Sequence, residues 1–499
     1  MDLSVVYSRA LAGIDAPLVR VETHLANGLP AFNIVGLPET TVRESKDRVR
    51  SAIINSHFTF PDRRITINLA PADLPKEGGR FDLPIALGIL SASGQIPSDR
   101  MSAHEFVGEL ALDGSLRPVP GIVAAASAAR GSNRNIAVAM ECGPRAAQVP
   151  DAAVVAAPDI LTLCAHLNGS VPIEPTCTPT AAKSVTPADL KDVIGQPAAR
   201  RALEVAATGG HNLLFWGPPG TGKTLLASRL PGILPDIDAS EALEGLALRD
   251  TLATSLPDTA LYARPFRNPH HSASATALVG GGNKPQPGEV SLAHGGVLFL
   301  DELPEFNRHC LEVLREPLES GEITLSRARY KVTYPARFQL IAAMNPCPCG
   351  YLGDRERACH CTPQQVQRYR ARVSGPLLDR IDLQVQVSRL PANQLISQSR
   401  EGESSACVRK RVTKVRAIQH ARQGSSNAHA SSQTIMQACN LGHAESDYLV
   451  AAADQLLLSG RGLHRTLRVA RTIADMAGAE QVDISHLNES LAYRNQDAG

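Results

Sequence analysis

Eight consecutive residues, GPPGTGKT, form a glycine-rich stretch that ends in lysine and threonine. They follow the apolar run LLFW and precede LLASRL, so the sequence predicts a strand, a phosphate-binding loop and a helix in that order. Glycine lets backbone N–H groups wrap phosphate oxygens, and the start of the helix adds a favourable dipole. We expect the lysine to reach the β- and γ-phosphates and the threonine hydroxyl to ligate Mg²⁺. The predicted ATP-binding residues of this stretch are Gly217, Pro218, Pro219, Gly220, Thr221, Gly222, Lys223 and Thr224.

Two acidic residues, Asp301 and Glu302, directly follow a second apolar run, VLFL. A buried parallel strand presents its carboxyl end where ligands bind in such sheets. We expect Asp301 to hold hydrated Mg²⁺ and Glu302 to orient and activate the attacking water. A third apolar run, FQLIAAM, ends at Asn345, whose amide could contact the same water or the γ-phosphate. Taken alone, this asparagine is equally well explained as a turn former.

Arg380, within SGPLLDRID, follows a short apolar helix. A single phosphate loop lacks a cation over the far side of the γ-phosphate, and an arginine from a neighbouring subunit in that position raises the rate by roughly 10³–10⁵. The alternative is an ion pair within the chain, with Asp379 or Asp382. The sequence leaves both interpretations open.

Four of the ten cysteines lie directly after Asn345, in the stretch NPCPCGYLGDRERACHCTP. Four thiolates on one short loop suit a tetrahedral structural Zn²⁺. The sequence therefore predicts a zinc loop formed by Cys347, Cys349, Cys359 and Cys361, on the nucleotide side of the sheet. Reduced surface thiols or a redox switch are the alternative.

The surrounding chain divides by pattern into an α/β region, a linker, a second α/β region and a helical region. We expect these boundaries at residues 1–167, 168–186, 187–386 and 387–499. The net charge of +1 gives no overall sign of a polyanion partner, so any basic surface must be local. No apolar run reaches the roughly 18 residues that span a bilayer, and the N-terminus does not look like a signal peptide. We therefore expect a cytoplasmic protein without a membrane partner.

These motifs resemble the AAA+ ATPases of the magnesium-chelatase-like branch, and most closely the bacterial ComM/YifB family. The resemblance covers nearly the whole chain and rests on DVIGQPAARRALEVAATGGHNLLFWGPPGTGKT, RPFRNPHHSASATALVGGG, PGEVSLAHGGVLFLDELPEF, AAMNPCPCGYLGD, SGPLLDRIDL and LHRTLRVARTIAD. It implies a P-loop NTPase core with a parallel sheet, a C-terminal helical lid, and a ring, expected as a hexamer, with ATP between subunits. It casts Asn345 as first sensor, Arg380 as arginine finger and Arg461 as second sensor, with Arg465 and Arg468 close by.

The resemblance also implies a DNA helicase that promotes branch migration during natural transformation, with recombination proteins as further partners. SGEITLSRARYKVTYPARF predicts a hairpin with Arg327, Arg329 and Lys331 near its turn, and cations repeated around a ring would follow a single-stranded or branched DNA backbone. A solvated hairpin is the alternative. Residues 264–290 are a second candidate pore loop. Its adjacent His270 and His271 could ligate a metal, but without further ligands at suitable spacing we expect them to be structural. The basic stretch VRKRVTKVRAIQHAR is expected to be a solvated helix face.

The first region resembles the proteolytic domain of Lon proteases, an α+β fold, through PADLPKEGGRFDLPIALGIL and FVGELALDGSLRPVPGIVAAASAA. Lon-type proteolysis needs a serine nucleophile and a lysine base. Arg80 stands at the serine position and Val123 at the lysine position, so we expect no proteolysis but an assembly or DNA-guiding role. Other functions remain open: a chelatase-type or protein-remodelling ATPase, or an ATP-gated scaffold. The D-x-S-x-S metal motif of chelatase partners is absent from the sequence.

Overall fold

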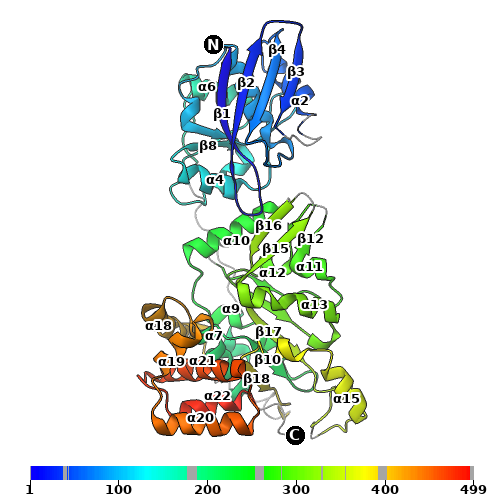
Figure 1. Cartoon of the computed structure of the whole chain (residues 1–499), viewed down its shortest axis with the longest axis vertical. Coiled ribbons are helices and arrows are strands. Elements are labelled where there is room, and N and C mark those ends of the chain that lie inside the picture. Colours follow the sequence, from blue (N-terminus) through cyan, green and yellow to red (C-terminus); the bar gives the residue numbers. More distant parts are fainter. Residues whose placement is uncertain are drawn as a thin grey trace. The chain divides into compact units, whose positions relative to one another are not determined.

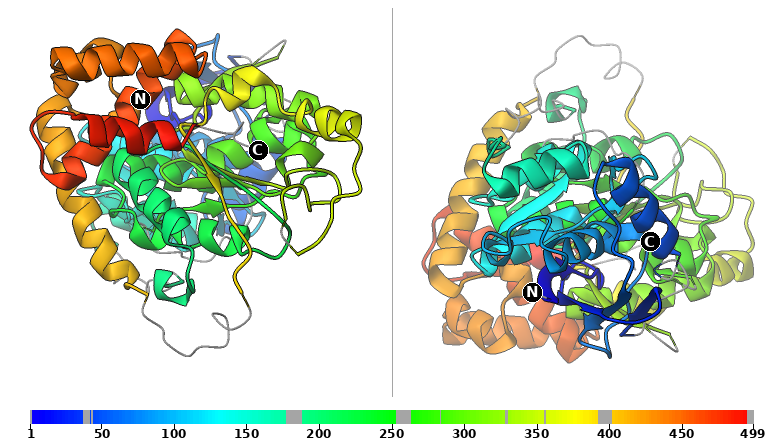
Figure 2. Two further views of the ribbon diagram at one scale, coloured as in Figure 1. Left: turned by 90° about the horizontal axis from the view of Figure 1, so that it is seen from below. Right: turned by 90° about the horizontal axis from the view of Figure 1, so that it is seen from above.

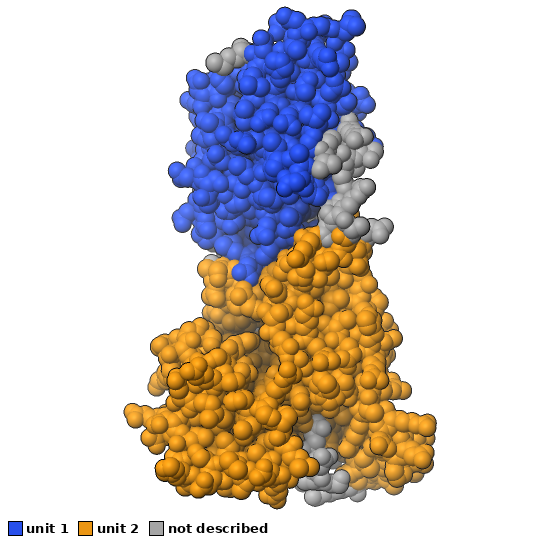
Figure 3. Space-filling model, in the orientation of Figure 1, with its two compact units in different colours: residues 1–184, 242–261 blue, residues 185–241, 262–499 orange. Residues whose placement is uncertain are grey.

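The computed structural model describes residues 2–36, 42, 44–176, 188–252, 263–282, 284–327, 330–354, 356–391 and 402–494. The chain forms two compact units, residues 1–184 with 242–261 and residues 185–241 with 262–499 (Figure 3). Most of the expected linker 168–186 lies outside the described residues. The domain boundaries expected from the sequence stay predictions. Across the described ranges, no helix is both long and apolar enough to cross a membrane.

The first unit is built on a mixed seven-stranded sheet of order β3-β4-β2-β1-β5-β8-β9 (Figure 1). β2 pairs antiparallel with β1 and β4, and the remaining neighbours pair in parallel. In β2 and β4, buried residues alternate with more exposed ones, as expected for strands covered on one face. The strands are β1 (Leu3–Arg9), β2 (Leu18–Ala26), β3 (Ala31–Val35), β4 (Arg64–Ala70), β5 (His104–Phe106), β8 (Asn135–Ala139) and β9 (Val154–Ala157), with a small ribbon of β6 (Glu109–Leu110) and β7 (Leu116–Arg117).

One helix of this unit is buried along its whole length. Every residue of α3 is buried, since RFDLPIALGILSASG is apolar on all sides of a helix, and α3 packs on β1 and β2. The expected strands at β2 and β4 and the expected helix at α3 are confirmed. The helices are α2 (Ser45–Asn55), α3 (Asp82–Ala92), α4 (Ile122–Gly131), α5 (Gly143–Ala146) and α6 (Ile160–Asn168).

A segment from the middle of the chain also belongs to the first unit. α10 (Ala239–Thr251) begins in the second unit, but residues 242–261 are grouped with the first. Leu243, Leu246 and Ala247 of α10 pack against the apolar core of the first unit. No motif or pattern in the sequence predicted this grouping.

The second unit contains a five-stranded parallel sheet of order β11-β14-β17-β10-β18. Its central strands are fully buried apolar runs, because helices cover both faces of such a sheet. The strands are β10 (Leu213–Trp216), β11 (Phe266–Arg267), β14 (Val297–Leu300), β17 (Gln339–Met344) and β18 (Leu383–Gln386). Two ribbons accompany it, β12 (Gly280–Gly281) with β13 (Gln286–Pro287), and β15 (Glu322–Arg327) with β16 (Tyr330–Pro335).

The C-terminal helices gather on one flank of the second unit, drawn in orange and red in Figure 2. α18 and α21 pack against α7, which joins them to the sheet region. The helical character expected for residues 387–499 is confirmed within the described part. The helices of the unit are α7 (Pro197–Gly209), α8 (Lys223–Ala227), α9 (Leu230–Ile233), α11 (Ala275–Val279), α12 (Glu289–Leu292), α13 (Arg308–Glu312), α14 (Pro317–Ser320), α15 (Pro363–Arg370), α16 (Gly375–Leu378), α18 (Ser405–Gln423), α19 (Ser432–Cys439), α20 (His443–Gln455), α21 (Gly460–Ala477) and α22 (Ile484–Ala492).

A buried carboxylate joins the helical flank to the sheet. Asp382, which precedes β18, pairs with Arg465 of α21 at 2.6 Å and accepts a hydrogen bond from the backbone N–H of Asn212 at 3.0 Å. Burial by itself would raise the pKa of Asp382, but the charge of Arg465 and the contact with His211 hold that pKa well below its usual value. The ionised carboxylate is therefore the stable form in the folded chain.

Asp382→Asn should destabilise the second unit at pH 7 by about 3 kcal/mol, because it leaves the partly buried charge of Arg465 without its carboxylate partner. A depressed carboxyl pKa contributes stability above the unfolded value, about 3.9, and that contribution is lost as the pH falls further. The difference between parent and variant, measured from denaturant unfolding midpoints, should therefore shrink below about pH 4. Asp454→Asn, at an exposed position of α20, is the control and should leave the midpoint unchanged. An unchanged midpoint in Asp382→Asn would contradict the assignment.

Candidate functional site

The carboxyl ends of three neighbouring strands bring the predicted nucleotide residues to one edge of the sheet. β17 lies between β10 and β14, and all three run in parallel. The phosphate loop follows β10, Asp301 and Glu302 follow β14, and Asn345 follows β17. The parallel topology therefore places the glycine-rich loop, the acidic pair and the asparagine side by side, as the sequence predicted.

Lys223 is buried at this edge and is held by oxygen atoms alone. Its ammonium donates to the backbone carbonyls of Gly217 at 2.7 Å and Pro218 at 2.9 Å, and to Oδ1 of Asn345 at 3.2 Å. Burial lowers the pKa of Lys223 to about 8, while the charges of Asp301 and Glu302 oppose that shift. Because the Lys223 ammonium is largely removed from water, phosphate oxygens could replace its carbonyl partners at little further desolvation cost.

The glycines of the loop hold conformations that other residues would not tolerate. Gly222, which caps α8, has a φ of +89°. At Gly217, with a φ of +155°, an added Cβ would lie 2.2 Å from the carbonyl oxygen of Val387. The loop is therefore built for close backbone approach, which is what phosphate binding by N–H groups requires.

Thr224 and Asp301 form a pair of oxygen ligands. The hydroxyl of Thr224 donates to Oδ2 of Asp301 at 2.7 Å, and both side chains are accessible at the loop. Hydroxyl and carboxylate oxygens are the protein ligands that Mg²⁺ takes when phosphates and water supply the rest of its octahedron. The donor set thus fits a magnesium ion bound with a nucleotide.

Glu302 has a strained backbone and an unexpected partner. Its φ of +53° lies in the left-handed region, which is uncommon for a residue with a side chain. Oε2 of Glu302 lies 3.4 Å from Nδ1 of His271, and the side chain of Glu302 is 52% exposed. The sequence singled out His270 and His271 only as structural residues, because nothing in their spacing places one of them beside a carboxylate on another strand.

The four predicted cysteines converge. The sulfur of Cys347 lies 3.3 Å from that of Cys349 and 3.7 Å from that of Cys359, and all four Sγ atoms, including that of Cys361, lie within 4.8 Å of one another. A backbone hydrogen bond from Tyr351 lowers the pKa of Cys349 to about 6, so this thiol ionises at neutral pH. Four sulfur donors at this spacing fit one thiophilic, tetrahedral cation.

The cysteine loop also lies against the phosphate loop. At Gly350, with a φ of +85°, an added Cβ would meet the ring of Pro219 at 2.8 Å. The expectation that the cysteines lie on the nucleotide side of the sheet therefore agrees with this contact. An ordered cysteine loop would therefore also support the phosphate loop at Pro219.

Arg380 and Arg461 lie near the opposite edge of the sheet, away from the phosphate loop of their own chain. Arg380 precedes the start of β18, and β18 pairs with β10 so that Leu383 faces Leu213. Glu319, on α14, binds Arg380 and also lies 3.9 Å from Arg461. Arg380 is only 5% exposed, whereas the side chain of Arg461 is 71% exposed. The sequence offered Asp379 or Asp382 as a partner for Arg380, and missed Glu319 because α14 is distant along the chain.

The two arginines near Arg461 have structural partners. Arg465 pairs with Asp382, and Arg468 donates to the backbone carbonyl of Ala430 at 2.8 Å. Both guanidinium groups therefore have a partner within the second unit. Arg461 is thus the member of this set that is most accessible to a partner molecule.

The basic hairpin forms as expected. β15 and β16 pair antiparallel with Arg327 opposite Tyr330 and Ser326 opposite Lys331. Side chains alternate along a strand, so Arg327 and Lys331 lie on opposite faces, and both are exposed. Arg329, the third predicted cation, lies outside the described residues.

The hairpin contacts the second candidate pore loop. The hydroxyl of Tyr334 in β16 donates to the backbone carbonyl of Pro285 at 2.9 Å. Figure 1 shows β15 and β16 beside β12 of this loop. The hairpin and the second candidate pore loop, which the sequence analysis considered separately, therefore lie against each other.

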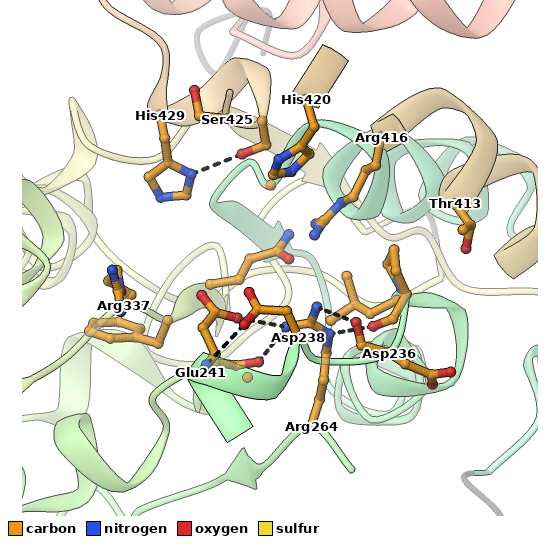
Figure 4. A pocket seen from close by; sticks show the side chains of 18 of the residues that line it. Asp236, Asp238, Glu241, Arg264, Arg337, Thr413, Arg416, His420, Ser425 and His429 are labelled. Atoms are coloured by element: carbon orange, nitrogen blue, oxygen red, sulfur yellow. Dashed lines mark hydrogen bonds and ion pairs between the residues drawn. The ribbon is translucent and has the colours of Figure 1, made fainter. Parts of the chain in front are cut away.

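A cavity of about 600 Å³ lies at the starting edge of the sheet, bordered by Gly296 and Gln339 (Figure 4). Arg416 and His420 of α18 point into it from one side, opposite Asp238 and Glu241. Burial lowers the pKa of Arg416 to about 9. The basic stretch was expected to be a solvated helix face, but its Arg416 points inward. The cavity is distinct from the phosphate edge, the carboxyl edge of the sheet that carries the glycine-rich loop, the acidic pair and Asn345.

Three family descriptions match the chain. "Magnesium chelatase, subunit ChlI" matches residues 189–395, "Subunit ChlI of Mg-chelatase" matches residues 21–141, and "Magnesium chelatase, subunit ChlI C-terminal" matches residues 402–494. Together they span the glycine-rich loop, the acidic pair, the cysteine loop and the helical flank.

Similar proteins extend over the same length. The chain is 51% identical to YifB of Salmonella typhimurium over 498 residues, which is 100% of this chain and 98% of that protein. It is also 51% identical to the competence protein ComM of Haemophilus influenzae over 501 residues, 99% of this chain and 98% of that protein. A match at 26% identity over 198 residues, 33% of this chain and 34% of the relative, is to Lon protease 2 of Bacillus subtilis.

Proposed function

Because the chain belongs to the ComM/YifB family of magnesium-chelatase-like proteins, we propose that it is a cytoplasmic ATPase that forms a ring, expected as a hexamer, and moves DNA. Its action would be that of a helicase promoting branch migration of recombination intermediates during natural transformation, where recombination proteins would be its partners. The observation that carries the proposal is the phosphate edge, where Lys223, the Thr224–Asp301 pair and Glu302 meet. The identity with a competence protein supports the biological setting.

Each residue of the phosphate edge has a role in the proposed hydrolysis. Lys223 would bind the β- and γ-phosphates, and Thr224 with Asp301 would hold Mg²⁺, which neutralises phosphate charge when bound. Glu302 would orient the attacking water and draw its proton, and Asn345 would fix the position of the lysine and the γ-phosphate. The left-handed backbone of Glu302 is the kind of local strain that is often found at functional sites.

Arg380 and Arg461 would complete the site of a neighbouring subunit. β18 has four residues, and a strand of that length spans about 13 Å, so both arginines are far from the phosphate loop of their own chain. A head-to-tail ring brings one edge of each subunit against a different edge of the next. Glu319 holds both guanidinium groups in the isolated chain, and a neighbour's phosphate would take its place.

The DNA-binding surface would be the hairpin together with the neighbouring pore loop. Arg327 and Lys331 are exposed there, and Tyr334 fixes the hairpin to Pro285. The same pore-loop segment carries His271, which contacts Glu302. A DNA strand that displaces this segment would therefore also move a partner of the water-activating residue, which gives a physical route for DNA to change the rate of hydrolysis.

The cysteine loop would hold a structural Zn²⁺. The four sulfur atoms are close enough for one ion, and the loop packs on Pro219 through Gly350. A bound zinc can contribute roughly 10–16 kcal/mol, enough to order a loop without an apolar core. Its role would be to brace the phosphate loop from the side.

A protein-remodelling ATPase or an ATP-gated scaffold is the second candidate. The mixed interior of the 600 Å³ cavity and the exposed Arg461 could serve a protein partner as well as a neighbouring copy. The two functions differ in whether DNA stimulates the ATPase, and variants of the hairpin test this difference.

The ATPase rate should rise in the presence of single-stranded or branched DNA, and the double variant Arg327→Ala/Lys331→Ala should lose most of that rise. Removing two cations also makes DNA affinity less dependent on salt. The control is Lys410→Ala/Lys414→Ala, which removes two exposed cations of α18 and should keep the stimulation. An ATPase that no DNA form stimulates would favour the remodelling or scaffold function.

Glu302→Gln should bind ATP and assemble but hydrolyse it at least about 100-fold more slowly, since it removes the group that takes the proton from water. Lys223→Ala should lose nucleotide binding, measured with a fluorescent ATP analogue. Glu305→Gln, an exposed acid close by that pairs with Arg372, is the control and should keep the parental rate. Parental hydrolysis by Glu302→Gln would remove the catalytic assignment.

Protein purified without chelator should contain about one zinc per chain by metal analysis. Cys349→Ser should fall below half that content and bind ATP more weakly, because the loop that packs on Pro219 loses its support. Cys407→Ser changes an exposed cysteine outside the cluster and should keep its zinc. A parent protein with less than half a zinc per chain would exclude the zinc site.

A further inference from the structure

The former protease centre of the first unit is occupied by a side chain from a distant part of the chain. Val123, at the position of the catalytic lysine, lies in the first turn of α4, and its backbone N–H donates to Oδ2 of Asp250 at 2.9 Å. The backbone N–H of Gly121 donates to the backbone carbonyl of Asp250 at 3.1 Å. The C-terminal end of α10 therefore contacts the position that corresponds to the catalytic lysine of Lon-type proteases.

Basic side chains complete this carboxylate site. Arg145 of α5 donates to Oδ1 of Asp250 at 2.7 Å. Arg80, at the position of the catalytic serine, is buried, and burial lowers its pKa to about 10 while the charge of Asp250 opposes the shift. Asp250 itself is only 3% exposed. The Asp250 carboxylate is fully buried and is held by the N-terminus of α4, by a salt bridge and by a second nearby cation. These partners form a specific carboxylate-binding site and not a chance surface contact.

The segment that delivers Asp250 has its own apolar contacts. Ala247, 6% exposed, and the partly buried Leu243 and Leu246 pack against the core of the first unit. These residues belong to α10, whose first turn lies in the second unit. The polar anchor and the apolar contacts thus hold the same stretch of helix.

We propose that the inactivated protease centre is a carboxylate-binding site whose ligand is Asp250, and that it fastens a segment of the ATPase region to the first unit. The substitutions at positions 80 and 123 remove the nucleophile and the base, and leave a basic, N–H-lined recess that retains a peptide segment instead of cleaving it. The first unit would then act as an anchor for the ATPase. This binding does not depend on the proposed action on DNA.

Hydrogen–deuterium exchange on the full-length chain tests the anchor. In Asp250→Asn, amides of residues 121–124 and 243–252 should exchange at least tenfold faster, while amides of β2 and β4 keep the parental rate. Asp62→Asn, an exposed acid of the same unit, should change none of these segments. Unchanged exchange at 243–252, or an equal acceleration throughout the first unit, would overturn the proposal.

A second variant covers the case in which Asp250→Asn does not fold. Arg145 is 38% exposed, so Arg145→Gln removes one partner of the carboxylate without opening the core. It should accelerate exchange in the same two segments, and parental exchange there would overturn the proposal. Neither measurement uses DNA or ATP turnover, so a failure of the proposed motor function leaves this test intact.

Discussion

A lysine ammonium removed from water at the carboxyl edge of a parallel sheet organises the second unit. Moving a charge out of water is unfavourable, and Lys223 is stabilised by two backbone carbonyls, by the amide oxygen of Asn345 and by the charges of Asp301 and Glu302. Those carbonyls belong to the glycine loop, and the amide comes from the strand next to it. The conformation of the glycine loop and the placement of Asn345 therefore both contribute to holding the same buried charge.

In the proposed mechanism, the two edges of this sheet carry complementary halves of one site. The carboxyl edge offers a cation, two magnesium ligands and a carboxylate for water, and the starting edge offers Arg380 and Arg461 with Glu319 between them. A strand length separates the halves, so the chain cannot close them on itself. We therefore propose that the working unit is a pair of neighbouring copies, and that the carboxylate site around Asp250 would add an anchor within each copy.

The sequence predicted what depends on local pattern. Apolar runs bounded by glycine or acids located β10, β14 and β17, and because parallel strands end at one edge, the meeting of Lys223, Asp301 and Asn345 followed from topology alone. Four cysteines on a short loop were likewise bound to lie close together. The sequence could not predict contacts between elements distant along the chain. Three such contacts depend on how helices and loops pack, which sequence periodicity does not reveal. They are Glu319 with Arg380, His271 with Glu302, and Asp250 with the backbone of Val123.

If ATP is hydrolysed at a seam between two copies, a mixture of two inactive variants should form some working seams. Arg380→Ala keeps an intact phosphate edge, and Glu302→Gln keeps an intact arginine, so a mixed ring contains some seams with both. Each variant alone should hydrolyse ATP slowly, and the mixture should recover activity. A mixture no faster than its components at any ratio, or full activity in Arg380→Ala alone, would contradict it.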